Sequence, residues 1–179
     1  MVKVVSIISI CFLLLGCDLT LSKNKHEEFN SHKKTEVAVS GVGMNIFLIS
    51  PNRDSIRIKN LIDGCISKIL LLRVPRYSCS SCVNREIIEL CNLSNNNMNI
   101  KSVIITEYED LRLFRAFATN ILIKNISIYN CQIRLNKLDE QGNPYYLLIN
   151  NRGELLKYFV IDKRDFRATD RFFNKYKLK

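Results

Sequence analysis

The stretch Lys68–Leu93 reads KILLLRVPRYSCSSCVNREIIELCNL and joins an apolar run, a polar break, two cysteines and a second apolar pattern. Ile69–Leu72 and Val74 form a short continuous apolar run, which is typical of a strand buried on both faces of a sheet. Pro75 has no N–H to donate, so the hydrogen-bonded ladder should end there. We therefore expect a central strand over residues 68–74.

The second half of the stretch predicts a helix that begins at the two cysteines. From Cys82 onward the apolar residues recur at helical spacing, and Arg85, Glu86 and Glu89 are expected to face water. Cys79 then lies where a strand gives way to a helix N-terminus. Unpaired N–H groups and the helix dipole stabilise a thiolate there, so Cys79 should be acidic and nucleophilic.

The spacing of the two cysteines predicts redox chemistry. Cys82 follows Cys79 by one turn and could attack a mixed disulfide formed at the first sulfur, so that the pair exchanges two electrons with a partner. A structural disulfide and a soft-metal site remain as alternatives. A structural zinc site is disfavoured because there is no second CxxC, and His26 and His32 lie far upstream. We expect no metal and no cofactor.

The composition is that of a globular protein of one domain. The chain has 179 residues, of which 47% are hydrophobic and 25% are charged. The formal net charge of +10 is spread along the chain, without a dense Lys/Arg block that interleaves aromatic residues. We therefore expect a solvated basic surface that favours anionic membranes or acidic partners, and no nucleic-acid site.

The N-terminal segment has the pattern of an export signal. Lys3 provides a positive charge and Val4–Leu15 provides an apolar region too short to span a membrane stably. Leu14-Leu15-Gly16-Cys17 resembles a bacterial lipobox, which implies that Cys17 is lipidated and becomes the mature N-terminus. Asp18 resembles an inner-membrane retention signal, although the choice of membrane stays open. We predict a lipoprotein signal over 1–17, a flexible tether over 18–40 and a folded domain over 41–179.

The number of cysteines argues against a disulfide framework. Besides the anchor, the mature chain would keep an odd number of thiols, at Cys65, Cys79, Cys82, Cys91 and Cys131. One redox pair with buried, inert neighbours fits this number better than a set of structural disulfides. A second buried pair between Cys91 and Cys131 stays open.

The remaining patterns predict strands and helices in alternation. Apolar runs indicate a first strand or hairpin over 37–50, strands near 56–59 and 98–106, and a short strand plus a connection over 121–129. A helix is expected over 107–120. Two runs around Asn151-Arg152-Gly153 predict a β-hairpin, and 162–177 predicts a closing helix that begins near Asp162 or Asp165. This order predicts an α/β fold with helices covering a mixed sheet.

The layout from Ser55 to Lys179 resembles the thioredoxin fold, a three-layer sandwich with a mixed central sheet flanked by helices. The resemblance implies that Cys79 is the attacking thiol and Cys82 the resolving thiol. It also implies that Pro144 is a cis-proline and that Asn143 offers its backbone to an extended client. Tyr77 and Ser78 stand in place of the family's tryptophan, and Tyr77 is a candidate substrate-binding residue.

Two further features bear on the chemistry that this resemblance implies. The central strand contains no acidic residue to accept a proton, so Glu107 or Glu109 is the candidate acceptor. A peroxiredoxin reading is disfavoured because Arg76 occupies the place, three residues before Cys79, where those enzymes carry threonine.

The sequence thus predicts a membrane-anchored lipoprotein facing the periplasm or the cell exterior. Its lead-in before the motif resembles membrane-tethered thiol-disulfide oxidoreductases, which implies disulfide exchange between Cys79, Cys82 and client proteins. An upstream redox partner is also implied, and we expect a monomer. The alternatives are a binding or scaffold module of the same fold, a soft-metal carrier, and a surface lipoprotein of unrelated fold.

Overall fold

The computed structural model describes residues 45–62, 68–97, 99–121, 125–135, 137–165 and 167–178. The expected signal over 1–17 with its anchor Cys17, the tether over 18–40, and Cys65 lie outside these residues. In the ranges described, no helix is long and apolar enough to cross a membrane.

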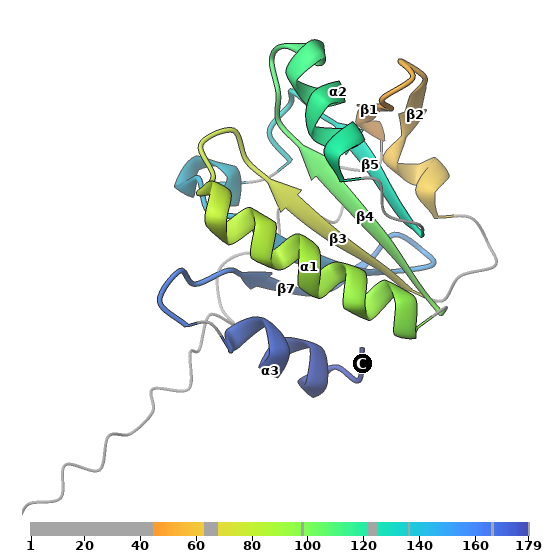
Figure 1. Ribbon diagram of the computed structural model, residues 1–179. Helices are drawn as coiled ribbons and strands as arrows, with labels where there is room; N and C mark the ends of the chain where they lie inside the picture. Colours follow the sequence, from red (N-terminus) through yellow and green to blue (C-terminus); the bar gives the residue numbers. More distant parts are fainter. Residues whose placement is uncertain are drawn as a thin grey trace, which may run out of the picture. The chain divides into compact units, whose positions relative to one another are not determined.

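A seven-stranded mixed sheet forms the centre of the domain, with strand order β2-β1-β5-β4-β3-β6-β7 (Figure 1). Strands β3, β4 and β5 are parallel, and the other neighbouring strands pair antiparallel. The bounds are β1 Phe47–Ile49, β2 Ser55–Arg57, β3 Lys68–Val74, β4 Ile100–Thr106, β5 Ile126–Asn130, β6 Tyr145–Asn150 and β7 Leu155–Val160.

Strand β3 has a neighbour on each side, as its apolar run predicts. Leu71 pairs with Val103 of the parallel strand β4 and with Leu147 of the antiparallel strand β6. The strand ends at Val74, directly before Pro75, which confirms the predicted boundary. Because both faces of β3 are buried, the strand holds its C-terminal end, and the segment that follows, in a fixed place.

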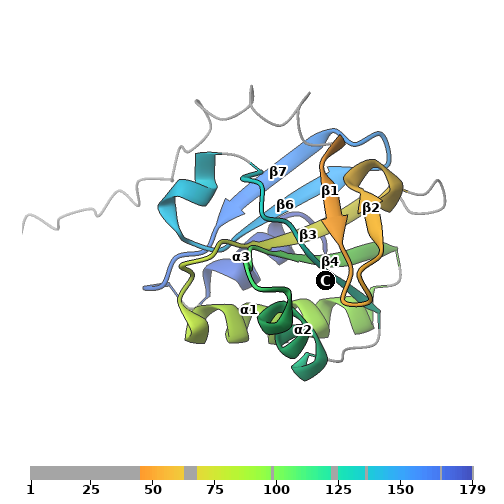
Figure 2. The same ribbon diagram turned by 90° about the horizontal axis from the view of Figure 1, so that it is seen from above.

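Three α-helices pack against the sheet (Figure 1): α1 Ser80–Asn96, α2 Leu111–Asn120 and α3 Ala168–Lys175. Side chains of α1 and α3 share one core with one face of the sheet, and Phe117 of α2 packs against it. The opposite face packs on the 3₁₀ segments η2 Ile58–Leu61 and η3 Lys137–Gln141 (Figure 2). The expected mixed sheet with flanking helices is therefore confirmed.

Several element boundaries differ from the sequence patterns. Helix α2 begins at Leu111 and not at residue 107, because the Asp110 carboxylate accepts from the Arg112 N–H and caps it there. Helix α3 begins at Ala168, because the Asp162 and Asp165 carboxylates accept from Arg164 and Arg167 N–H groups in turns before it. Strand β5, Ile126–Asn130, is the short strand expected near 121–129, and it ends one residue further along.

Glu86 contradicts the expectation that it faces water. Its side chain is fully buried, one carboxylate oxygen accepting from the Thr169 hydroxyl at 2.8 Å and the other from the Arg85 guanidinium. The Tyr146 hydroxyl donates to the backbone carbonyl of the same residue at 3.1 Å. The helical pattern predicts that one face of α1 is exposed to solvent. In the structure α3 packs against part of that face, and its Thr169 hydroxyl is a hydrogen-bond partner of the Glu86 carboxylate.

Candidate functional site

Cys79 caps helix α1 directly after the turn that follows β3. Ser78 N–H donates to the Pro75 carbonyl at 3.1 Å, which turns the chain away from the sheet. Cys79 itself is extended, and Val83 N–H donates to its carbonyl at 3.0 Å, the first bond of the helix. The predicted place of Cys79 at a helix N-terminus is therefore confirmed.

The surroundings of the Cys79 sulfur favour the thiolate. Its pKa is lowered to about 6, chiefly because the Cys82 thiol donates to it, and then because the Ser81 hydroxyl and backbone N–H groups do. The Sγ of Cys79 lies 3.1 Å from the Ser81 Oγ. Since Cys79 is only partly buried, a thiolate at this position can be reached from solution.

Cys82 lies one turn further along and is the buried member of the pair. It is 8% exposed, and burial is the main cause that raises its pKa, followed by its bond to Cys79. Lys163, in the connection before α3, acts in the opposite direction. Both cysteines are free thiols here, so the structure holds the reduced pair, with one acidic sulfur exposed and one protonated sulfur behind it.

The loop before β6 approaches the segment that precedes the cysteines. A Cβ added to Gly142 would lie 3.9 Å from the Tyr77 Cβ, so the two segments are in contact. The Pro144 carbonyl accepts from Ile161 N–H, whereas Asn143, within the described part of the chain, makes no backbone hydrogen bond. Tyr77 is 80% exposed, with the Arg76 guanidinium 5.2 Å from its ring centroid.

The expected cis bond before Pro144 is wrong, because no cis peptide occurs among the described residues and both Asn143 and Pro144 are among them. Gly142 makes the bend instead: its φ is +64°, a value that favours glycine, and its N–H donates to the Asp139 carbonyl. The loop therefore turns at the glycine, and the proline enters the strand with a trans bond.

Sequence reasoning missed Arg73, a fully buried cation near the end of β3. Its guanidinium donates to both oxygens of Asp139 at 3.0 and 3.1 Å and to Glu107 at 2.9 Å. It also donates to the backbone carbonyls of Thr106, the last residue of β4, and of Cys131, directly after β5. Arg73 thus ties η3, which leads into the 142–144 loop, to the C-terminal ends of β4 and β5. A charged residue inside an apolar run was the available signal.

The two candidate proton acceptors are both engaged by arginine. Glu107 is paired with Arg73, and its side chain is 20% exposed. Glu109 forms a surface pair with Arg76, so the connection after β4 is anchored to the segment just before Cys79. Both candidate carboxylates are therefore already occupied by guanidinium groups.

The remaining described cysteines are far from the pair in the fold. Cys91 packs against the core that α1 and α3 share, whereas Cys131 belongs to the core on the opposite face of the sheet. Both are free thiols, and burial raises the pKa of each. A disulfide between them is excluded, because the sheet separates them. Across the described ranges no three His, Cys, Asp or Glu side chains gather as a metal site.

Comparison with known proteins places the fold. No family model matches the chain, and no curated protein does. Many solved structures resemble it, and three of them, each at low sequence identity, illustrate the likeness. The PrxQ protein of Xylella fastidiosa, in a Cys-to-Ser mutant, has 13% identity and a TM-score of 0.57, over 82% of this chain and 97% of that one.

The second structure is a secreted Mycobacterium tuberculosis disulfide oxidoreductase homologous to E. coli DsbE. It has 13% identity and a TM-score of 0.50, over 67% of this chain and 86% of that one. The third is a peroxiredoxin-like protein from Aquifex aeolicus with 10% identity and a TM-score of 0.52, over 75% and 83%. At these identities the likeness establishes a thioredoxin-like fold and leaves the activity to the site.

Proposed function

We propose that this chain is a thiol-disulfide oxidoreductase that exchanges the Cys79–Cys82 disulfide with client proteins. The observation that carries the proposal is the contrast within the pair. An exposed sulfur whose pKa is about 6 is the nucleophile, and a buried thiol one turn away donates to it. At neutral pH most of Cys79 is then thiolate, which is the form that attacks disulfides.

Reduction of a client proceeds in two displacements. The Cys79 thiolate attacks one sulfur of the client disulfide, forms a mixed disulfide and releases the other client sulfur as a thiolate. Cys82 then attacks the Cys79 sulfur, forms the internal disulfide and releases the first client sulfur. The proton that Cys82 loses ends on a client thiolate, and two electrons pass from protein to client. The reverse sequence oxidises a client dithiol.

The loop before β6 supports binding of an extended client segment beside Cys79. Among the described residues Asn143 makes no backbone hydrogen bond, and it precedes strand β6, which pairs with β3 on one side and with β7 on the other. Main-chain hydrogen bonds to such a segment give affinity without demanding one sequence. Tyr77, exposed and next to Gly142, adds an apolar surface to the same place.

Reduction of insulin disulfides tests the proposal. Wild-type protein, supplied with dithiothreitol, should accelerate precipitation of the insulin B chain, and Cys79→Ser should not. Cys82→Ser should instead accumulate a mixed disulfide, which is visible on a non-reducing gel and lost on a reducing one. A cell extract passed over this variant would identify the client. Equal, slow alkylation of both cysteines, together with no insulin reduction, would favour the scaffold module instead.

We also propose that the protein acts outside the cytoplasm, tethered through a lipidated Cys17. The support is the sequence pattern that ends at this cysteine. Metabolic labelling with a radioactive fatty acid should mark the wild-type protein and leave Cys17→Ala unlabelled. Labelling that survives this substitution would contradict the proposal.

A further inference from the structure

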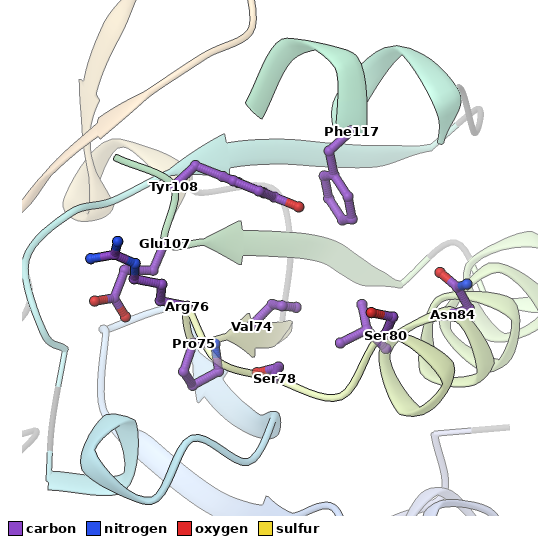
Figure 3. Close-up of a pocket in the computed structure, with 10 residues that line it drawn as sticks. Val74, Pro75, Arg76, Ser78, Ser80, Asn84, Glu107, Tyr108 and Phe117 are labelled. Carbon is purple, nitrogen blue, oxygen red and sulfur yellow. The ribbon is translucent and has the colours of Figure 1, made fainter. Parts of the chain in front are cut away.

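A pocket of about 160 Å³ opens at Ser78 and Ser80, the residues on either side of Cys79 in the chain (Figure 3). It lies between the start of α1, the end of β3 and the connection from β4 to α2. Val74 and Phe117 form apolar walls, and Ser78, Ser80, Asn84 and Tyr108 bring hydroxyl and amide groups to it. Ser78 and Ser80 flank Cys79 in the chain, so anything in this pocket lies close to the reactive sulfur.

The hydroxyl of Ser78 points to a missing partner. Its oxygen is buried and makes no hydrogen bond with the described part of the chain. A buried hydroxyl without a partner destabilises a protein unless something else satisfies it. The Tyr108 hydroxyl likewise has no hydrogen bond to any described residue, and its side chain reaches toward Phe117 (Figure 3). A buried hydroxyl and a more accessible one, neither bonded to a described residue, therefore line one small pocket.

The charges around the pocket restrict what can bind there. The two charged lining residues are Arg76 and Glu107, and each is already paired, with Glu109 and Arg73 respectively. No free charge remains to neutralise an ionised group, which would lose its hydration on entering. An aliphatic group would leave the Ser78 hydroxyl unpartnered. The complementary group is neutral, with an apolar stem and a tip that both donates and accepts.

We propose that this pocket binds an asparagine or glutamine side chain next to the reactive cysteine of the client. The inference rests on the proposed function, because it assigns the client a chemical feature at the same site. A carboxamide can accept from one hydroxyl and donate to another, which satisfies Ser78 and Tyr108 together. The pocket is well below the usual size of a small-molecule site, so it suits a single side chain.

The test uses short blocked peptides that carry one cysteine and are oxidised to their symmetric disulfides. The residue next to the cysteine, before it in one series and after it in another, is glutamine, leucine or glutamate. Rate constants for reaction with the reduced protein are measured at pH 7, and bis(2-hydroxyethyl) disulfide serves as a substrate without side chains. The glutamine peptide should react on the order of tenfold faster than the other two in one series.

Glutamate is the sharpest control for charge, because it has nearly the shape of glutamine. The net charge of +10 should speed the approach of an anionic peptide, so a preference for glutamine cannot come from long-range attraction. Ser78→Ala and Tyr108→Phe should each lower the ratio of glutamine to leucine rates toward one. Ser78→Ala should also unfold at the same temperature as wild type or higher, since the hydroxyl that it removes is unpartnered.

Ser102 offers a matched variant. Its buried hydroxyl also lacks a partner, but it lies in the middle of β4, away from the pocket. Ser102→Ala should keep the glutamine preference. Equal rates for all three peptides, or a preference for leucine or glutamate, would overturn the pocket assignment alone. If bis(2-hydroxyethyl) disulfide and every peptide failed to react, the proposed function would fall, and this inference with it.

Discussion

Cys79 and Cys131 are the same side chain in opposite surroundings. Both lie beyond the C-terminal end of a parallel strand, Cys79 after β3 and Cys131 directly after β5. Cys79 caps a helix, accepts hydrogen bonds and has a lowered pKa, whereas Cys131 is 2% exposed and has a pKa raised by burial. The Cys131 thiol donates to the Ile133 carbonyl at 3.4 Å. A position after a strand is therefore not enough to lower the pKa of a cysteine. The hydrogen bonds that lower it at Cys79 come from Ser81 and Cys82 in the first turn of α1.

The two thiols should differ most clearly in activity when each is removed in turn. Cys79→Ser should lower insulin reduction at least about 100-fold, because the nucleophile is lost. Cys131→Ser should keep activity near that of wild type, because its sulfur lies in the core of the opposite face. Steady-state rates for both variants, with circular dichroism to check folding, measure this. Comparable losses in the two would show that the activity does not depend on the acidic thiol.

Asp139→Asn tests whether the ion pairs of Arg73, which also bonds the Cys131 carbonyl, affect the chemistry at Cys79. It leaves the Arg73 cation buried with one carboxylate fewer, and such a loss costs about 3–5 kcal/mol of the free energy of unfolding. The neighbouring change Glu140→Gln removes a surface pair with Arg134, worth about 0–1 kcal/mol.

Urea unfolding measures both changes. In the Asp139→Asn variant, Cys131 should react faster with a thiol reagent because the core around it opens more often. The pKa of Cys79 should stay near 6, since none of the groups that lower it belongs to the Arg73 cluster. A large shift of the Cys79 pKa would show that the two faces are coupled.

The pH dependence of alkylation separates the two thiols by rate. With a pKa of about 6, Cys79 passes from about one-tenth thiolate at pH 5 to about nine-tenths at pH 7. Its reaction with iodoacetamide should therefore rise about tenfold over that interval and then level off. Cys131 should be slow throughout, with a rate that begins to rise only in alkaline solution. Mass spectrometry of the labelled peptides assigns each rate to its residue.

The sequence was sufficient to predict the features that depend on local patterns. The apolar run of β3, the stop at Pro75, the helix after Cys79 and the hairpin around residues 151–153 follow from periodicity and turn chemistry, and all are present. The two cysteines are three residues apart on one chain segment, so their proximity is local as well.

Features that depend on distant segments were out of reach. The burial of Glu86 depends on Thr169, 83 residues away, and the environment of Arg73 depends on Asp139, 66 residues away. Neither partner follows from a helical or strand pattern, because each lies on another element. The pocket at Ser78 and Ser80 is likewise lined by distant residues, namely Tyr108 in the connection after β4 and Phe117 in α2.

The smallest expected effect is a difference in how the two thiols change stability with pH, and it has opposite signs. Between about pH 6 and the ordinary thiol pKa near 8.5, the unfolded chain binds a proton at Cys79 that the folded chain has lost, so the stability of the reduced protein rises with pH. Cys79→Ala should flatten that rise, modestly, because the sulfur is reachable by water.

At Cys131 the folded state holds its proton longer than the unfolded state, so this thiol makes stability fall above about pH 8.5, and Cys131→Ala should remove part of the fall. Urea midpoints of wild type and both variants from pH 6 to pH 10, under a reductant, measure the slopes. Slopes of the same sign for the two thiols would mean that the helix terminus does not select between thiol and thiolate.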